Sequence, residues 1–112
     1  MLASSHRITR GDDYRRVVRR GKRRAAANTV TYITMNPNGG SPRFGFIVAK
    51  NVGNAVHRNR VRRRLKAAAY ALVPTVGDGT DVVVRALPAA SDASFADLSA
   101  ELARAMAPKD AR

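Results

Sequence analysis

The chain has 112 residues, of which 45% are hydrophobic, and it carries a formal net charge of +13. Its length allows one domain with a modest core, and its apolar content excludes a disordered basic tail, so we expect a single domain over 1–112 with an ordered core at about 7–106. Because the chain has no cysteine, disulfides, thiolate metal sites and cysteine nucleophiles are excluded.

The first predicted element is a helix over about 12–20, with Thr9 or Asp12 as its N-cap and Gly21 as its stop. Its apolar side is formed by Tyr14, Val17 and Val18.

Two strands are predicted next. The segment 28–35 is rich in β-branched residues, and the segment 43–49 places apolar residues at alternate positions. A turn over 36–42, with two prolines and two glycines, separates them, so we predict an antiparallel hairpin. We also allow for a further short strand within 21–27.

A long helix is predicted over about 55–73, followed by a strand over 81–87 and a last helix over about 95–106. Apolar residues recur on the long helix at spacings of four, three and four: Val61, Leu65, Ala68 and Leu72. Three consecutive valines at 82–84 predict a strand buried on both faces, and Ser94 with Asp97 resembles a capping box. This order indicates an α+β fold, a two-layer sandwich of helices on a small, mostly antiparallel sheet.

The positive charge falls in two blocks. Residues 7–24 hold nine Lys or Arg against two acids, and 50–66 hold seven basic residues and no acid. A solvated face normally mixes signs, so these blocks predict a surface that binds a polyanion, most commonly nucleic acid. A membrane is not expected as the partner, because no apolar run approaches roughly 20 residues and residues 1–10 lack the apolar core of a signal peptide. We therefore expect a cytoplasmic protein.

On the long helix, Arg58, Arg62 and Lys66 are four residues apart and line up beside the apolar stripe. This basic row is therefore expected at the edge between helix and sheet, where arginine can bind a phosphate in two places. Asn59, next to the row, either bonds base edges or sugar hydroxyls or holds a loop in place, and spacing alone leaves both roles open. The other arginines of the helix are expected to point in other exposed directions: Arg60, Arg63 and Arg64.

Two further features have more than one interpretation. The loop 50–54 leads to a helix N-terminus, where free amide N–H groups can bind an anion and Asn54 can serve as an ordinary cap. Tyr14 and Tyr32 are either core residues or platforms on which unpaired RNA bases stack. His57 is interpreted as a surface residue.

An enzyme that acts alone finds little support. The eight acidic residues are scattered, and the adjacent Asp12 and Asp13 are explained by helix capping and the helix dipole. The sequence contains neither a glycine-rich phosphate loop nor a set of histidine, carboxylate and nucleophile. It therefore predicts no catalytic residue and no metal site in the protein.

One long segment resembles the signature of the bacterial ribonuclease P protein family: RFGFIVAKNVGNAVHRNRVRRRL at 43–65. Residues 13–21 resemble the first helix of that family and 81–90 its late strand and turn, so the resemblance extends over roughly 7–106. An ordered signature of this length is far more specific than a basic run.

The resemblance implies a function and its partners. Proteins of this family pair with a large catalytic RNA, and the complex removes the 5′ leader from precursor tRNA by a metal-dependent hydrolysis that the RNA performs. It implies that the protein is a monomeric subunit of an endoribonuclease and forms a 1:1 complex with the RNA. It also implies that the protein binds no cofactor itself and that the RNA holds the Mg²⁺ of the complex. It also implies a left-handed βαβ crossover, against the usual preference and shared with a ribosomal protein domain.

The resemblance also implies two sets of RNA-binding residues. The basic helix and its loop would face the RNA subunit: Lys50, Asn54, Arg58, Asn59, Arg60, Arg62, Arg63, Arg64 and Lys66. A cleft between this helix and the sheet would hold the single-stranded leader: Tyr14, Val18, Val30, Tyr32, Arg58, Asn59, Arg62 and Lys66. Val18 stands where the family often has Phe, and Asn51 where a second Lys is common, and both differences can weaken leader contacts without changing the role.

Two other functions agree with the charge and the fold class. A structural ribosomal protein would bind rRNA and show no preference for tRNA that carries a leader. A non-specific nucleic-acid chaperone would bind by charge alone, with a steep salt dependence and no loss of affinity on Asn59→Ala.

Overall fold

The structure is a computed structural model that describes residues 2–107. Its helices and strands are α1 (Gly11–Arg20), β1 (Lys22–Ala25), β2 (Thr29–Met35), β3 (Arg43–Ile47), α2 (Ala55–Leu72), β4 (Thr80–Ala86) and α3 (Phe95–Met106). The described residues also contain four short 3-10 helices: η1 (Ser4–His6) before α1, and η2 (Lys50–Val52), η3 (Val73–Thr75) and η4 (Pro88–Asp92) between later elements. The predicted elements are therefore confirmed to within one or two residues, including the short strand within 21–27.

The four strands form one sheet in the order β1-β2-β4-β3. β2 is antiparallel to both of its neighbours, whereas β3 is parallel to β4. The prediction that β2 and β3 form a hairpin is therefore wrong, because β4 lies between them. β4 lies between β2 and β3 because its side chains at 82–84 are fully buried on both faces of the sheet. The turn residues between β2 and β3 contain no information about β4, which follows much later in the chain.

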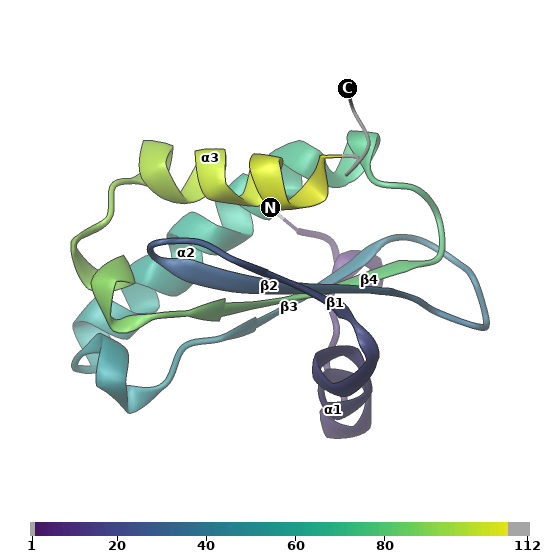
Figure 1. The fold of residues 1–112 in the computed structure, drawn as a ribbon, viewed down its shortest axis with the longest axis horizontal. Helices are drawn as coiled ribbons and strands as arrows, with labels where there is room; N and C mark the ends of the chain where they lie inside the picture. Colours follow the sequence, from purple (N-terminus) through teal and green to yellow (C-terminus); the bar gives the residue numbers. More distant parts are fainter. Residues whose placement is uncertain (1, 108–112) are drawn as a thin grey trace.

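The helices cover both faces of the sheet unequally. α2 and α3 lie side by side on one face, and α1 crosses the other (Figure 1). The larger core joins α2 and α3 to the sheet through Phe44, Leu65, Val82 and Leu98, all nearly inaccessible to solvent. A smaller cluster lies under α1 and includes Val17 and Val83. The α+β sandwich predicted from the sequence is confirmed, with α1 as an additional helix on its second face.

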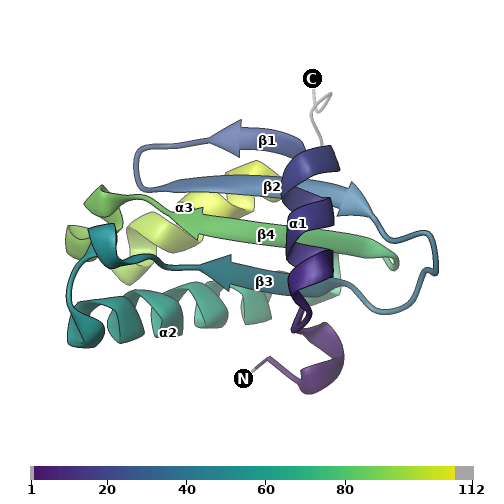
Figure 2. The same ribbon diagram turned by 90° about the horizontal axis from the view of Figure 1, so that it is seen from below.

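The connection from β3 through α2 to β4 is left-handed. Figure 2 views the sheet from the α1 side, with β3 and β4 both pointing to the left, β4 above β3 and α2 behind the sheet. The chain leaves β3, returns behind the sheet through α2 and enters β4 above β3, which is a left-handed turn. This hand is rare among βαβ units. It places α2 beside β3, at the edge of the sheet opposite β1.

The ends of the helices show what each cap contributes. Asn54 accepts the backbone N–H of His57 and caps α2, and Ser94 and Asp97 form the expected capping box on α3. The predicted cap of α1 is wrong: Arg10 is the N-cap and makes no side-chain cap bond. Asp12 and Asp13 instead lie in the first turn of α1, where the positive end of the helix dipole stabilises their negative charges.

Glu101 is a buried acid that fastens α3 to the β1–β2 connection. The residue is 6% exposed, and its carboxylate accepts hydrogen bonds from the Asn28 backbone N–H, the Asn28 side-chain amide and the Thr29 hydroxyl. We expect Glu101→Ala to lower the free energy of unfolding by about 1–3 kcal/mol, since it leaves buried donors unsatisfied. Urea denaturation checks this, with Asp97→Ala, which removes an exposed cap, as a control expected to cost about 1 kcal/mol.

Candidate RNA-binding interface

The basic row of α2 is positioned by the apolar stripe on the same helix. Val61, Leu65 and Ala68 are fully buried against the sheet and α3, and Leu72 is half-buried at the end of the helix. Docking this stripe fixes the rotation of α2 about its axis. Arg58, Arg62 and Lys66 consequently lie half-buried along the flank of the stripe, as their spacing predicts.

Arg62 and Lys66 line a hollow with Tyr14 at the edge of the sheet. The hollow has a volume of about 190 Å³, and β3 forms its floor through Phe44 and Phe46. Arg7 and Ile8, from the segment before α1, complete its wall. Two cations of α2 and an aromatic ring of α1 therefore meet over the outer strand β3, although α1 and α2 lie on opposite faces of the sheet.

Tyr14 also borders a second hollow, on the α1 side of the sheet. This hollow is about 360 Å³ in volume, and Val18 and Ile47 form its apolar surface. Its cations are Arg15, Arg19 and Arg85. The two hollows share Tyr14, so the sequence-predicted cleft residues Tyr14, Val18, Arg62 and Lys66 do come together, as a discontinuous groove around one edge of the sheet.

Val30 and Tyr32 lie deeper than the leader cleft predicts. They belong to the cluster beneath α1 and are only 4% and 6% exposed. The guanidinium of Arg85 lies 5.6 Å from the centre of the Tyr32 ring, within the range of a cation–π interaction. Tyr32 thus contacts Arg85, which lines the second hollow, without lining the hollow itself. Of Tyr14 and Tyr32, only the half-buried Tyr14 presents an edge that RNA can reach.

Arg58 and Asn59 lie on the same helix but line neither hollow. Asn59 is exposed, and its side-chain oxygen accepts a hydrogen bond of 2.9 Å from Arg62, so it orients an arginine of the row. The Nε of Arg58 is buried without a hydrogen-bond partner among the described residues. An anion or a water at this guanidinium would satisfy it.

The remaining predicted RNA-facing residues are spread around α2 and its loop. Lys50 and Arg63 are exposed, and Arg60 is half-buried. Arg64 departs from the prediction that it points outward: it is half-buried and donates a 2.7 Å hydrogen bond to the carbonyl of Ala93, tying α2 to the segment before α3. His57 bonds Asn54 through its ring, which agrees with a surface role in the helix cap.

Gly45 makes room for the Tyr14 ring. A Cβ on Gly45 would lie 2.6 to 2.8 Å from two ring carbons and the hydroxyl oxygen of Tyr14, and the Phe46 backbone N–H donates to that hydroxyl at 3.2 Å. We expect Gly45→Ala to displace the ring and to lower the free energy of unfolding by about 1–3 kcal/mol. Thermal unfolding checks this; Gly77→Ala, where an added Cβ meets nothing within 4 Å, should change stability by less than about 0.5 kcal/mol.

An ion network holds α1, and with it Tyr14, on the sheet. Asp81 of β4 is fully buried and accepts hydrogen bonds from Arg43 at 2.8 and 3.0 Å and from Arg16 of α1. Asp13 lies 3.6 Å from both arginines. Burial pushes the pKa of Asp81 upward, but the hydrogen bonds and charges of Arg43 and Arg16 outweigh burial and hold this pKa below its ordinary 3.8. The same contact with Asp81 raises the pKa of Arg43.

The sequence interpretation missed several members of the groove. Arg7, Arg15, Arg19 and Arg85 line the two hollows, yet none belongs to the basic block of α2. The density of arginine in 7–24 was the available signal for three of them. For Arg85 the only available signal was its position directly after three buried valines of β4, where a charged residue is unusual.

Within residues 2–107, no group of three or more His, Cys, Asp or Glu side chains is arranged to hold a metal ion. The helices in that range are also too short or too polar to cross a bilayer.

The fold and the groove define a class: a small α+β protein with a strongly basic surface and a partly aromatic groove, features typical of proteins that bind nucleic acid. Comparisons with known proteins agree and specify the class. The family model described as Ribonuclease P matches residues 2–109. The ribonuclease P protein component of Clavibacter michiganensis is 45% identical over 106 residues, which cover 95% of this chain and 94% of the relative. That of Acidothermus cellulolyticus is 46% identical over 105 residues, covering 93% and 88%.

Solved structures give the same answer for the fold. The RNase P protein of Staphylococcus aureus aligns with a TM-score of 0.81 at 26% identity, covering 90% of this chain and 92% of the other. The RNase P protein of Thermotoga maritima aligns with a TM-score of 0.77 at 21% identity, covering 89% and 94%, and supports the fold alone. The chain belongs to the bacterial ribonuclease P protein family, and its role is that of an RNA-binding component in the processing of tRNA 5′ ends.

Proposed function

We propose that this protein binds the single-stranded 5′ leader of precursor tRNA in the groove around β3, while the exposed side of α2 and its loop bind the ribonuclease P RNA. One observation carries the proposal: Tyr14 lies between two hollows, with Arg62 and Lys66 on one side and Arg85 on the other. A flexible strand can place a base against the tyrosine edge and its phosphates against the cations. A regular duplex keeps its bases stacked inside and cannot offer one to Tyr14.

In this proposal the RNA subunit carries out the hydrolysis, with its own Mg²⁺, and the protein positions the substrate. The buried acids of the described residues support the division, because both are committed to structural contacts: Asp81 binds two arginines, and Glu101 accepts hydrogen bonds from Asn28 and Thr29. The protein contributes positive charge, which lowers the cost of bringing two polyanions together. We further propose a cytoplasmic protein that acts as one copy per RNA.

Reconstitution with a ribonuclease P RNA tests the proposal. The protein alone should cleave nothing, and its addition should lower the Mg²⁺ or salt concentration that the RNA needs to process precursor tRNA. An RNA whose requirement does not change on addition of the protein would contradict the subunit role. Co-sedimentation with a ribosomal subunit, with equal affinity for precursor and mature tRNA, would instead support the structural ribosomal alternative.

A further inference from the structure

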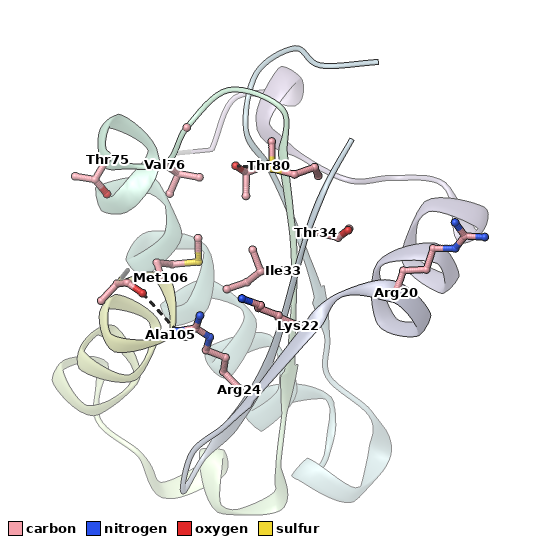
Figure 3. Close-up of a pocket in the computed structure, with 13 residues that line it drawn as sticks. Arg20, Lys22, Arg24, Ile33, Thr34, Thr75, Val76, Thr80, Ala105 and Met106 are labelled. Atoms are coloured by element: carbon pink, nitrogen blue, oxygen red, sulfur yellow. Dashed lines mark hydrogen bonds between the residues drawn. The ribbon is translucent and has the colours of Figure 1, made fainter. Parts of the chain in front are cut away.

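A third and larger hollow lies at the other edge of the sheet, away from the groove around β3. It has a volume of about 680 Å³ and lies among β1, the end of α1, the segment after α2 and the end of α3 (Figure 3). β1 and β3 are the two outer strands, so the two regions lie at opposite edges of the sheet. The leader groove and the contacts of α2 therefore leave this hollow without a role.

The hollow is lined by basic and apolar side chains. Lys22 and Arg24 extend from β1 into it, whereas Arg20 points away from it toward solvent (Figure 3). Within residues 2–107, no acidic residue lines the hollow and Lys22 forms no ion pair. Arg24 makes one long hydrogen bond, of 3.4 Å, to the carbonyl of Ala107. The positive charge of the two side chains is thus available to an anion.

The floor of the hollow is apolar but incompletely covered. Ile33, Val76 and Met106 pack against the main core, yet each remains half-buried and borders the hollow. The pairing register explains the mixture: Lys22 lies opposite Ile33 and Arg24 opposite Thr31, so both cations stand on the same face as the apolar floor. Arg23, between them, lies opposite Tyr32 and stands on the other face.

We propose that this hollow is a second binding site for single-stranded RNA, with a base against Ile33 and Met106 and the flanking phosphates at Lys22 and Arg24. Its volume falls in the range of sites that enclose a small organic group, which suits an unstacked nucleotide. A duplex keeps its bases stacked inside and cannot fill such a hollow. Two single-strand sites at opposite edges of one sheet would let the protein hold two separate RNA segments at once.

Titration of the isotopically labelled full-length protein with an octauridylate, followed by amide chemical shifts, tests the site directly. We expect saturable shifts at Val76, Gly77 and Met106, separate from those near Tyr14. Lys22→Ala with Arg24→Ala should weaken binding at this site at least about tenfold and reduce its salt slope by about 0.7 per lost phosphate contact. Absence of shifts at Val76 and Met106 would overturn the proposal.

A matched control separates the site from charge alone. Arg10→Ala with Arg23→Ala removes the same net charge from exposed positions that do not line the hollow, and it should change the affinity at this site less than about twofold. Equal losses in the two double variants would mean that only overall charge matters, and would overturn the proposal. Gly77→Leu, which adds bulk at the rim without changing charge, should also weaken the shifts at Met106.

The RNA that occupies the hollow can be identified by cross-linking. Because the chain has no cysteine, Thr75→Cys at the exposed rim accepts a single photoreactive label. A cross-link to the ribonuclease P RNA or to precursor tRNA identifies the source and supports the site; a cross-link to neither in the reconstituted complex contradicts it. The outcome is distinguishable from that of the leader proposal, since the shifts at Val76 and Met106 do not depend on stimulation of tRNA processing.

Discussion

Asp81→Asn is expected to lower the free energy of unfolding by about 3 kcal/mol, because it removes a fully buried carboxylate from between two arginines. In the variant, Arg16 and Arg43 would remain charged, and their remaining acidic partner would be Asp13, which lies farther from them than Asp81 does. For a domain of this size the loss corresponds to a fall in Tm of about 10 °C. Calorimetry of the wild type and the variant measures it directly.

The stabilisation by Asp81 should also depend on pH in a defined direction. Because the folded-state pKa of Asp81 is held below its ordinary 3.8, the contribution is complete above about pH 4 and is lost as the pH falls through the lowered folded-state value. The difference in stability between wild type and Asp81→Asn should therefore narrow only below about pH 4.

Asp12→Asn provides the control, because Asp12 and Arg15 form an ion pair in which both side chains are largely exposed. It should cost less than about 1 kcal/mol. A cost for Asp81→Asn as small as that of the control would show that the buried network does not hold α1 on the sheet.

Arg62→Ala is expected to weaken binding of leader-bearing tRNA about tenfold, and to weaken binding of mature tRNA much less. The guanidinium lines the hollow beside Tyr14, and one charge-assisted hydrogen bond to a phosphate has about this effect on affinity. Lys66→Ala should act in the same direction, since Lys66 lines the same hollow. Equilibrium binding of the two tRNAs to the reconstituted complex measures both losses.

Arg63→Ala is the matched control for this prediction. It removes the same charge from the same helix, but its side chain is exposed and lines neither hollow. It should therefore affect leader-bearing and mature tRNA equally. If Arg62→Ala also weakens both tRNAs equally, the leader does not occupy the groove around β3.

Asn59→Ala distinguishes the specific role from a charge-driven one. The Asn59 oxygen accepts from Arg62, so its loss should reduce the preference for leader-bearing tRNA without changing the net charge. A non-specific chaperone would show no change. Within the protein, the contact is neither of the two roles that spacing had left open: the Asn59 oxygen bonds a neighbouring arginine of the same helix, not a loop.

Local patterns in the sequence were sufficient for the elements and for the rotation of α2. Helix and strand periodicities depend on neighbouring residues, so the stripe through Val61, Leu65 and Ala68 and the capping box at Ser94 could be recognised without a fold. The same local reasoning placed Arg62 and Lys66 at the edge of the sheet. The resemblance at 43–65 then connected these residues to a family.

Contacts between distant segments could not be obtained in this way. The insertion of β4 between β2 and β3 depends on which strand can be buried on both faces, and no turn signal near Asn36 contains that information. The pairing of Asp81 with Arg16 joins residues 65 positions apart, and the burial of Tyr32 depends on α1 crossing the sheet above it.

Charge and periodicity alone thus established a basic α+β protein with a directed row of cations on one helix, because these properties follow from residue type and spacing. Folding determined which cations share a surface. The left-handed crossover sets α2 beside β3, and Asp81 anchors α1 across the opposite face. Tyr14 and Arg62, 48 positions apart in the chain, meet at one sheet edge for that reason, and Lys22 and Arg24 face a separate hollow at the other.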